Sequence, residues 1–183
     1  MDSRTPVEPT GAVAQYLTFS LLGEEYAVGL LKVREILEYD TVTRVPRSPA
    51  WVRGAINLRG RVVPVVDLAV RFGHPQQEIS RRTCIVILDV AVEGGTTVVG
   101  ILVDSVSQVI DLRDEEIEDA PAFGTKAPVE ELVGVAPLGK KFVLILDVDR
   151  VLSSSEAAEA ASVSLPPTET PAGESVAEEG KAR

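Results

Sequence analysis

Short apolar runs rich in Val, Ile and Leu occupy most of residues 15–152, and Gly or Pro interrupts them at close intervals. This spacing predicts many short strands, as in an all-β barrel or sandwich. Apolar and polar side chains alternate at 17–21 and at 41–45. The alternation predicts one strand that ends before Gly23 and another that ends before Pro46.

Glycines mark two predicted hairpins. Strands are expected at 55–59 and 61–66, joined tightly at Gly60. Two longer strands are expected at 83–92 and 96–103, with a Gly-Gly pair as the turn between them.

A short helix is expected before the first hairpin. Ser48 is a favourable N-cap, and Pro49 suits the first helical turn. Gly54 stands where a helix of one or two turns would end. Trp51, inside this segment, is expected to pack on its own barrel rather than to anchor a partner.

Two stretches of sequence occur twice in the same order. One begins with a Val-Gly-aliphatic step, and the other runs from a glycine to an aspartate 13 positions later. They are residues 28–37 and 99–110, and residues 54–67 and 134–147. The matches predict two similar β units, near 25–80 and 81–150, with terminal segments that cross between them. Because each unit is too small to bury a large core alone, we expect one domain with a groove between them.

The composition changes after Leu152. Residues 153–183 contain six Glu against one Lys and one Arg, and they lack aromatic side chains. Such a segment buries too little apolar surface to offset its ordering entropy, so we expect a disordered acidic tail there and a flexible N-terminus at 1–14. The tail carries −4 and the N-terminus −1, which leaves −5 of the total charge of −10 on residues 15–152.

Cysteine and histidine each occur once, as Cys84 and His74. These counts exclude intrachain disulfides and multi-Cys zinc sites, and they suit a reducing compartment. Cys84 lies in an apolar run and is expected to be a small buried hydrophobe, and His74 is expected to face solvent in a turn. Phosphate-loop, dinucleotide, zincin and nucleophile-elbow motifs do not occur. We therefore expect no enzyme activity, no cofactor and no metal.

The aspartates allow two interpretations. Asp67, Asp89, Asp104, Asp147 and Asp149 could form an acid–base or metal-binding set. Asp67 and Asp147, however, each end a predicted strand and precede an apolar stretch, where an aspartate caps a short helix. We favour capping, because it explains why the same residue occurs at the same place in both repeats.

Three arginines, Arg53, Arg59 and Arg61, surround the turn at Gly60. Arginines on a small barrel also occur in nucleic-acid-binding proteins. Here the neighbours are aliphatic rather than stacking aromatic side chains, and the acidic fold disfavours phosphate backbones. We instead expect Arg59 to be a fixed cation within reach of a carboxylate such as Glu35, where it orients a protein partner.

The longest apolar stretches, such as 62–66 and 142–146, are far shorter than the roughly 20 residues that cross a bilayer. The first nine residues are unlike a secretory signal. We expect a cytoplasmic protein without membrane insertion.

One motif, Asn-x-Arg-Gly-x-x-x-Pro-x-x-Asp-Leu, runs from Asn57 to Leu68. With its neighbours at 42–56 and flanking runs at 23–36, 99–109 and 146–152, it resembles the signature of the CheW chemotaxis coupling family.

The resemblance implies two SH3-like five-stranded β-barrels packed as one domain. It implies a non-catalytic adaptor that couples methyl-accepting chemoreceptors to the CheA histidine kinase, at membrane-associated arrays. The implied partners are the regulatory domain of the kinase, the cytoplasmic tips of the receptors, and other CheW copies in array rings. A coupler of a non-flagellar pathway, such as pili, gliding or development, is the alternative, and a nucleic-acid-binding barrel is the weakest one.

The resemblance also places eight residues on partner surfaces, without dividing them between kinase and receptor. Those of the first unit are Val33, Glu35, Ile36, Gly54, Asn57 and Arg59, and those of the second are Val106 and Val109.

Overall fold

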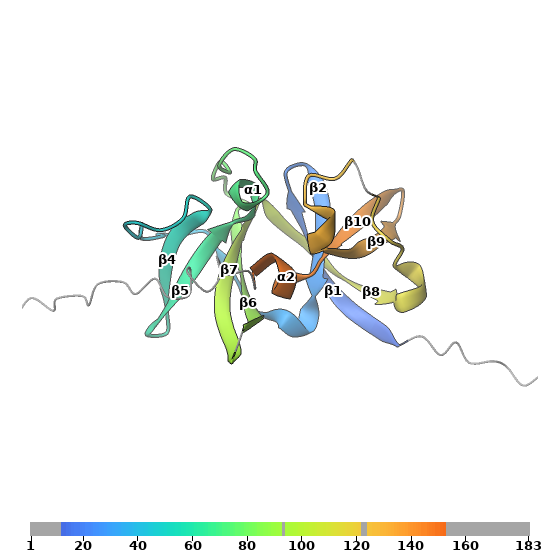
Figure 1. Cartoon of the computed structure of the whole chain (residues 1–183), viewed down its shortest axis with the longest axis horizontal. Coiled ribbons are helices and arrows are strands. Elements are labelled where there is room, and N and C mark those ends of the chain that lie inside the picture. Colours follow the sequence, from blue (N-terminus) through green and yellow to red (C-terminus); the bar gives the residue numbers. More distant parts are fainter. Residues whose placement is uncertain (1–11, 93, 122–123, 153–183) are drawn as a thin grey trace, which may run out of the picture.

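The computed structural model describes residues 12–92, 94–121 and 124–152, which form two five-stranded sheets lying side by side (Figure 1). The strands are β1 (Val13–Leu21), β2 (Glu24–Gly29), β3 (Val33–Glu38), β4 (Val52–Leu58), β5 (Arg61–Asp67), β6 (Cys84–Val92), β7 (Gly95–Val103), β8 (Ser105–Arg113), β9 (Leu132–Leu138) and β10 (Lys141–Leu146). The short helices are α1 (Leu68–Arg71) and α2 (Val148–Leu152), with 3₁₀ turns η1 (Leu30–Lys32), η2 (Asp114–Glu116) and η3 (Val129–Glu131). The two predicted hairpins are confirmed as β4–β5 and β6–β7.

The two sheets have the same spatial arrangement of strands, but the chain passes through the equivalent strands in a different order. Unit 1 has the order β3-β6-β7-β5-β4, and unit 2 has the order β8-β1-β2-β10-β9. The parallel pair β5–β7 of unit 1 is matched by β10–β2 in unit 2. Unit 2 is therefore a permuted copy of unit 1, completed by the first two strands of the chain.

The sheets divide the chain at other points than the expected units 25–80 and 81–150. Unit 1 is continuous from β3 through β7, whereas unit 2 takes strands from both ends of the chain. The physical reason is that a local repeat identifies similar segments but not the distant strands with which they pair.

The Val-Gly repeat lies in equivalent strands but is displaced. Gly100 of β7 pairs with β5. The equivalent residue of β2, which pairs with β10, is Ala27 rather than the repeated glycine Gly29. The displacement is two residues, so the alternation of side chains keeps the same faces inward.

A single bridge joins the edge strands of each unit. Thr43, beyond the end of β3, exchanges backbone hydrogen bonds with β4 (2.8 and 2.9 Å), and Glu118, beyond β8, exchanges them with β9 (both 2.8 Å). A Cβ at Gly54 would collide with the Thr43 carbonyl, and one at Gly134 with the Glu118 carbonyl. These repeated glycines therefore allow each sheet to close on itself.

Strands β5, β6, β7 and β10 each contain four or more consecutive buried residues, which accounts for their continuous apolar runs, whereas the edge strands β3 and β8 are largely exposed or half-buried. One core fills unit 1 and comprises Val63, Val65, Ile85, Ile87 and Leu102. Another fills unit 2 and comprises Ala27, Leu112, Ala136, Val143 and Ile145. The third and largest core joins the units and includes Leu17, Phe19, Tyr26, Val66, Leu88, Ile101 and Leu146. Both units thus depend on the same shared core.

The prediction of a helix between Ser48 and Gly54 is wrong. Residues 46–51 are irregular, with turns at 46–47 and 50–51, and β4 begins at Val52. The Ser48 hydroxyl donates to the Val45 carbonyl (2.8 Å), so it does not accept from a following helical N–H. The strand expected at 41–45 is reduced to the closing bridge. Trp51 packs against the shared core, as expected.

Helix capping by the repeated aspartates is confirmed. Asp67 Oδ1 accepts from the backbone N–H groups two and three residues later, at 3.0 and 3.3 Å. Asp147 Oδ1 does the same at 3.1 and 3.2 Å. These carboxylates therefore begin α1 and α2, which follow equivalent strands.

The single thiol and the single imidazole differ from expectation. Cys84 is half-buried against the shared core rather than fully buried. His74 is half-buried rather than solvent-facing, because its Nε2 lies 3.0 Å from the Lys126 carbonyl of unit 2. The loop that follows α1 thus contacts the other unit.

Candidate functional site

Five of the six residues expected on the first unit lie where the two edges of unit 1 are joined by the Thr43 bridge. Val33, Glu35 and Ile36 belong to the edge strand β3, Asn57 belongs to the other edge strand, β4, and Arg59 to the turn that follows it. The sixth, the glycine of the closing bridge, is buried beneath the chain. An ion pair joins the strand to the turn.

That ion pair is the expected contact of Arg59 with Glu35. Arg59 Nη2 donates to Glu35 Oε2 at 2.9 Å. The Arg59 side chain is 82% exposed and that of Glu35 is 23% exposed. Glu35 Oε1 is buried and has no hydrogen-bond partner among the described residues. The Arg59 guanidinium is therefore exposed to solvent, beside a carboxylate that has one oxygen buried without a hydrogen bond from the described residues.

The backbone presents Arg59 in a fixed way. Arg59 and Gly60 have φ of 51° and 83°, the pattern of a two-residue type I′ turn. Asn57 Oδ1 accepts from the Gly60 N–H at 2.9 Å, which stabilises the turn. A left-handed arginine costs about 1 kcal/mol. The turn therefore carries a cation where glycine or asparagine would fit with less strain.

Val106 and Val109 lie on β8, which is the counterpart of β3. Val33 and Val106 are half-buried against the shared core. Ile36 and Val109 are 43% and 46% exposed. Register with the neighbouring strands makes the two half-buried valines equivalent, and likewise the two exposed residues. The structure does not bring the pairs together; it repeats one apolar arrangement on separate sheets.

Each unit also carries a hollow beside the hairpin that precedes its short helix, β4–β5 in unit 1 and β9–β10 in unit 2. The hollow of unit 1 has a volume of about 480 Å³, and we call it the basic hollow. It is lined by Arg34, Arg59, Arg61, Val62, Thr96 and Thr97. The acidic hollow of unit 2, of about 690 Å³, is lined by Glu24, Glu25, Glu118, Asp119, Lys141 and Phe142. Val62 and Phe142 occupy equivalent strand positions and are 47% and 66% exposed. The two hollows are thus related surfaces of opposite charge.

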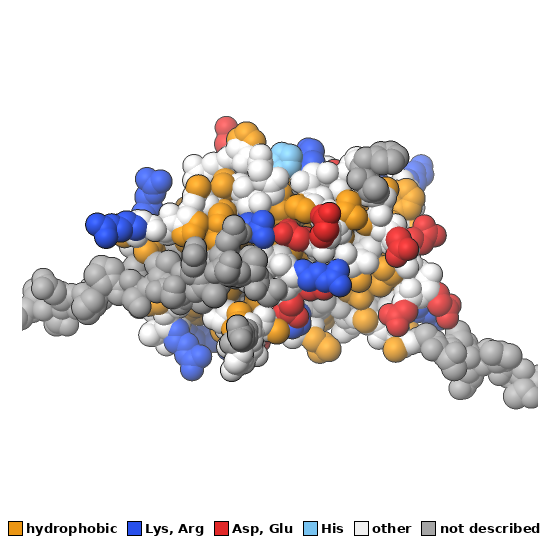
Figure 2. Space-filling model, viewed as in Figure 1, with side chains coloured by type: hydrophobic (Ala, Val, Ile, Leu, Met, Phe, Trp, Pro, Cys, Tyr) orange, Lys and Arg blue, Asp and Glu red, His pale blue; other side chains and the backbone are white. Residues whose placement is uncertain are grey.

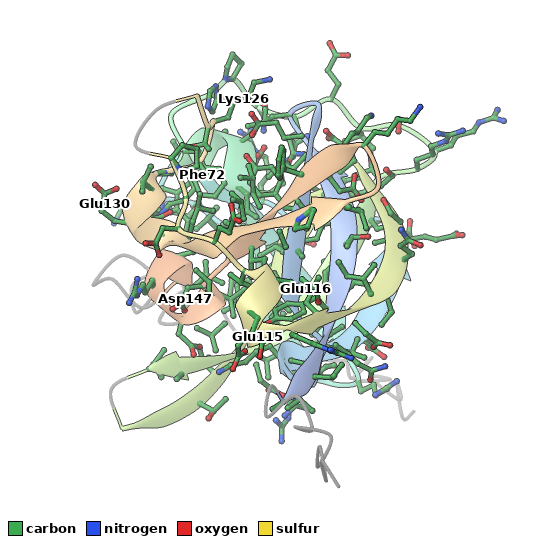
Figure 3. All side chains as sticks on the ribbon, turned by 90° about the vertical axis from the view of Figure 1, so that its right-hand side faces the viewer. Phe72, Glu115, Glu116, Lys126, Glu130 and Asp147 are labelled. Atoms are coloured by element: carbon green, nitrogen blue, oxygen red, sulfur yellow. The ribbon has the colours of Figure 1, made fainter. Side chains whose placement is uncertain are left out.

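The charge difference extends over the whole units. Residues 33–103 carry +2, whereas 15–32 and 104–152 together carry −7. Figure 2 shows basic side chains mainly over unit 1, at the left, and acidic ones over unit 2, at the right. Glu115, Glu116 and Glu130, labelled in Figure 3, contribute to the acidic surface of unit 2 from two short 3₁₀ turns.

The expected cluster of three arginines is divided. Arg53 points inward, with 16% of its side chain exposed, and donates to the fully buried Asp67 and to the Gln77 carbonyl (both 3.3 Å). Gln77 Nε2 donates to Asp104 at 2.7 Å, and Asp104 accepts from the Leu22 N–H at 3.1 Å. This buried network links the two units. No sequence motif marks Gln77, so the network could not be predicted.

The remaining aspartates pair with cations. Asp89 accepts from Arg34 at 2.6 Å. Asp149 accepts from Lys32 at 2.8 Å and from the Ala91 N–H at 2.9 Å. Burial raises the pKa of Asp149, but these hydrogen bonds outweigh it and hold the pKa below its ordinary value.

The five aspartates therefore do not gather into one acid–base set. Within residues 12–92, 94–121 and 124–152, no three His, Cys, Asp or Glu side chains are grouped to hold a metal ion. In the same part of the chain, no helix has the length and apolar character needed to span a membrane.

Comparison with known proteins gives a consistent result. The CheW-like domain model matches residues 15–156. The chemotaxis protein CheW of Klebsiella aerogenes is 40% identical over 144 residues, which cover 79% of this chain and 84% of the relative. Protein FrzA of Myxococcus xanthus is 31% identical over 127 residues, covering 67% and 75%.

A solved structure supports the same fold. The crystal structure of the scaffolding protein CheW from Thermoanaerobacter tengcongensis superimposes with a TM-score of 0.69 and 27% identity. The match covers 85% of this chain and 96% of that one. The chain, with its two related sheets, belongs to the CheW family of non-catalytic chemotaxis scaffold proteins.

Proposed function

We propose that this protein couples methyl-accepting chemoreceptors to a CheA-type histidine kinase, so that the state of the receptor controls kinase activity. The observation that carries the proposal is the repeated apolar surface: Ile36 on β3 and Val109 on β8 are exposed at equivalent positions of two units. A protein with two such surfaces can hold two partners at once. In this function it lies in the cytoplasm, at membrane-associated arrays, through protein contacts alone.

The first surface consists of Val33, Glu35, Ile36 and Arg59. The guanidinium of Arg59 keeps free N–H donors for a partner carboxylate. Two charges of opposite sign fix the orientation of a partner more than they add affinity. Asn57, which is exposed, supports this surface by stabilising the turn, and the buried Gly54 supports it by allowing the closing bridge.

Contacts with further copies of the same module rest on the two hollows. The basic hollow of one copy is complementary in charge to the acidic hollow of the next, and each has an exposed hydrophobe, Val62 or Phe142. Such a contact joins copies head to tail. The copies form a closed ring when the rotations between successive copies add up to a full turn. A kinase regulatory domain of the same fold would use the same complementarity.

The mechanism is state coupling. A receptor that moves between two states changes its contacts with the adaptor, and the kinase responds to that difference alone. By linkage, the transmitted free energy equals the difference in contact energy between the states, typically about 1 to 3 kcal/mol. The match to FrzA, a relative with a different name, favours a second candidate, a coupler of another chemosensory pathway.

Reconstitution with the cognate kinase and receptor tests the proposal. Arg59→Ala and Glu35→Lys should each abolish receptor-dependent kinase activation while the melting curve stays that of the parent. Arg81→Ala and Glu78→Lys, exposed in the loop before β6, are the matched controls and should activate normally. Normal activation by both surface variants would show that this surface is not the coupling surface.

A further inference from the structure

The basic hollow has an acidic counterpart in its own chain. Residues 153–183 follow α2 and lie outside the described part of the structure. Their six glutamates all precede the first basic residue, Lys181, so 153–180 carries only negative charge. We propose that this segment binds the basic hollow of unit 1 in cis and competes there with partners. The competition rests on the proposed function, whereas the binding does not.

The hollow offers donors for carboxylates. Arg34 and Arg59 have side chains 51% and 82% exposed, and each uses one nitrogen for an internal carboxylate. Arg61 is exposed, and no partner is recorded for it among the described residues. A guanidinium has five N–H donors, so most of them stay available. Thr96 and Thr97 line the same hollow.

The charge of the two units directs the segment to one of them. Unit 2 carries −7 and repels an acidic peptide, whereas unit 1 carries +2. At physiological ionic strength such forces act over about 8 Å. The segment must therefore be delivered close to the hollow before attraction contributes.

The position of α2 provides that delivery. Asp149 of α2 accepts from the Ala91 N–H on β6 of unit 1. Two residues before Ala91 on the same strand, Asp89 holds Arg34 of the hollow. The segment thus leaves the fold after Leu152, beside the strand that supports the hollow. A chain spans up to about 3.5 Å per residue, so residues 153–183 reach the hollow easily, and tethering gives an effective concentration of the order of millimolar.

Side-chain NMR of the full-length protein tests the contact without any partner. The variant has all six glutamates of 153–183 replaced by Gln. The Nε–Hε signals of Arg34, Arg59 and Arg61 should shift in this variant, and added salt should move the parent signals toward the same positions. A control variant, E115Q/E116Q, should leave them unchanged. Hollow signals that are identical in parent and variant, or equal shifts at Arg44 and Arg47, would overturn the proposal.

The second measurement concerns competition. The affinity of the purified kinase regulatory domain should be about twofold higher for the neutral-segment variant than for the parent. If the NMR contact is present and this affinity is unchanged, the competition is disproved and the contact stands. If no variant binds kinase or receptor, the proposed function fails, and the NMR result still decides the contact.

Discussion

The two units are built on one plan and differ in their surfaces. Both close on a glycine, and in both the hairpin that carries this glycine is followed by a helix with a capping aspartate. The hairpins before those aspartates differ. Unit 1 turns through Arg59-Gly60, both with positive φ, whereas unit 2 turns through Gly139-Lys140, with positive φ only at Gly139. The hollow of unit 1 is basic, whereas the equivalent hollow of unit 2 is acidic. Shared features therefore reflect folding, whereas on the proposed function the differing features select partners.

The largest expected effect tests a shared feature. Gly54→Ala and Gly134→Ala each force a methyl group against a backbone carbonyl, so each should lower the free energy of unfolding by about 3 kcal/mol in urea titrations. Gly139→Ala is the control. Its Cβ meets nothing within 4 Å, and only its φ of 61° is unfavourable, which costs about 1 kcal/mol. Equal losses at all three positions would show that closure does not limit stability.

The next effect separates the two capping aspartates. Asp67→Ala leaves the inward-pointing Arg53 without its carboxylate and should cost about 3 kcal/mol. Asp147→Ala removes a half-buried cap and should cost about 1 kcal/mol. Chemical denaturation measures both. The double variant D67A/R53A should recover part of the loss, and no recovery would argue against an unpaired cation as the cause.

A smaller effect should divide the partners. Ile36→Asp and Val109→Asp place a charge on the exposed apolar position of each unit, so each should weaken one partner about tenfold and spare the other. Stability should change by less than about 0.5 kcal/mol. Titration calorimetry with purified kinase domain and receptor fragment measures the binding. Val133→Asp, 49% exposed on β9, is the control. Equal loss of one partner in both variants would mean that the two surfaces act as one.

The smallest effect concerns Asp149, whose counterpart on α1 is Ala69. The lowered pKa of Asp149 means that its contribution is present above its ordinary value of 3.8 and is lost as pH falls through the folded pKa. Because the side chain is 35% exposed, Asp149→Asn should cost less than about 1 kcal/mol at pH 7. Unfolding of parent and variant should converge in acid. A difference that persists there would exclude ionisation as its source, and Asp111→Asn is the exposed control.

Local chemistry made part of this structure predictable. Asp67 and Asp147 could be identified as caps because a cap involves only the next three residues. Arg59 could be placed on a turn for the same reason. Ser48 shows the limit: its hydroxyl donates backward to a carbonyl instead of accepting from a helix, and both options suit the same local sequence.

The other features depend on distant strands. The equivalence of Ile36 with Val109 follows from pairing with β6 and β1, which the one-dimensional repeat does not specify. The buried link through Gln77 joins loops that are far apart in the chain. Opposite charge on two related hollows becomes visible only when the permuted unit is assembled.

That permutation has a consequence for synthesis on the ribosome. Unit 1 is complete once residue 103 has emerged, and its strands find their partners within one continuous stretch. β1 and β2 emerge earlier and can pair with each other, but the outer edge of β1 waits for β8 and that of β2 waits for β10, because Tyr26 pairs with Leu144. Distant pairing of this kind is slow and leaves strand edges open in the meantime. The sheet that β1 and β2 begin is therefore completed only when β10 has been made.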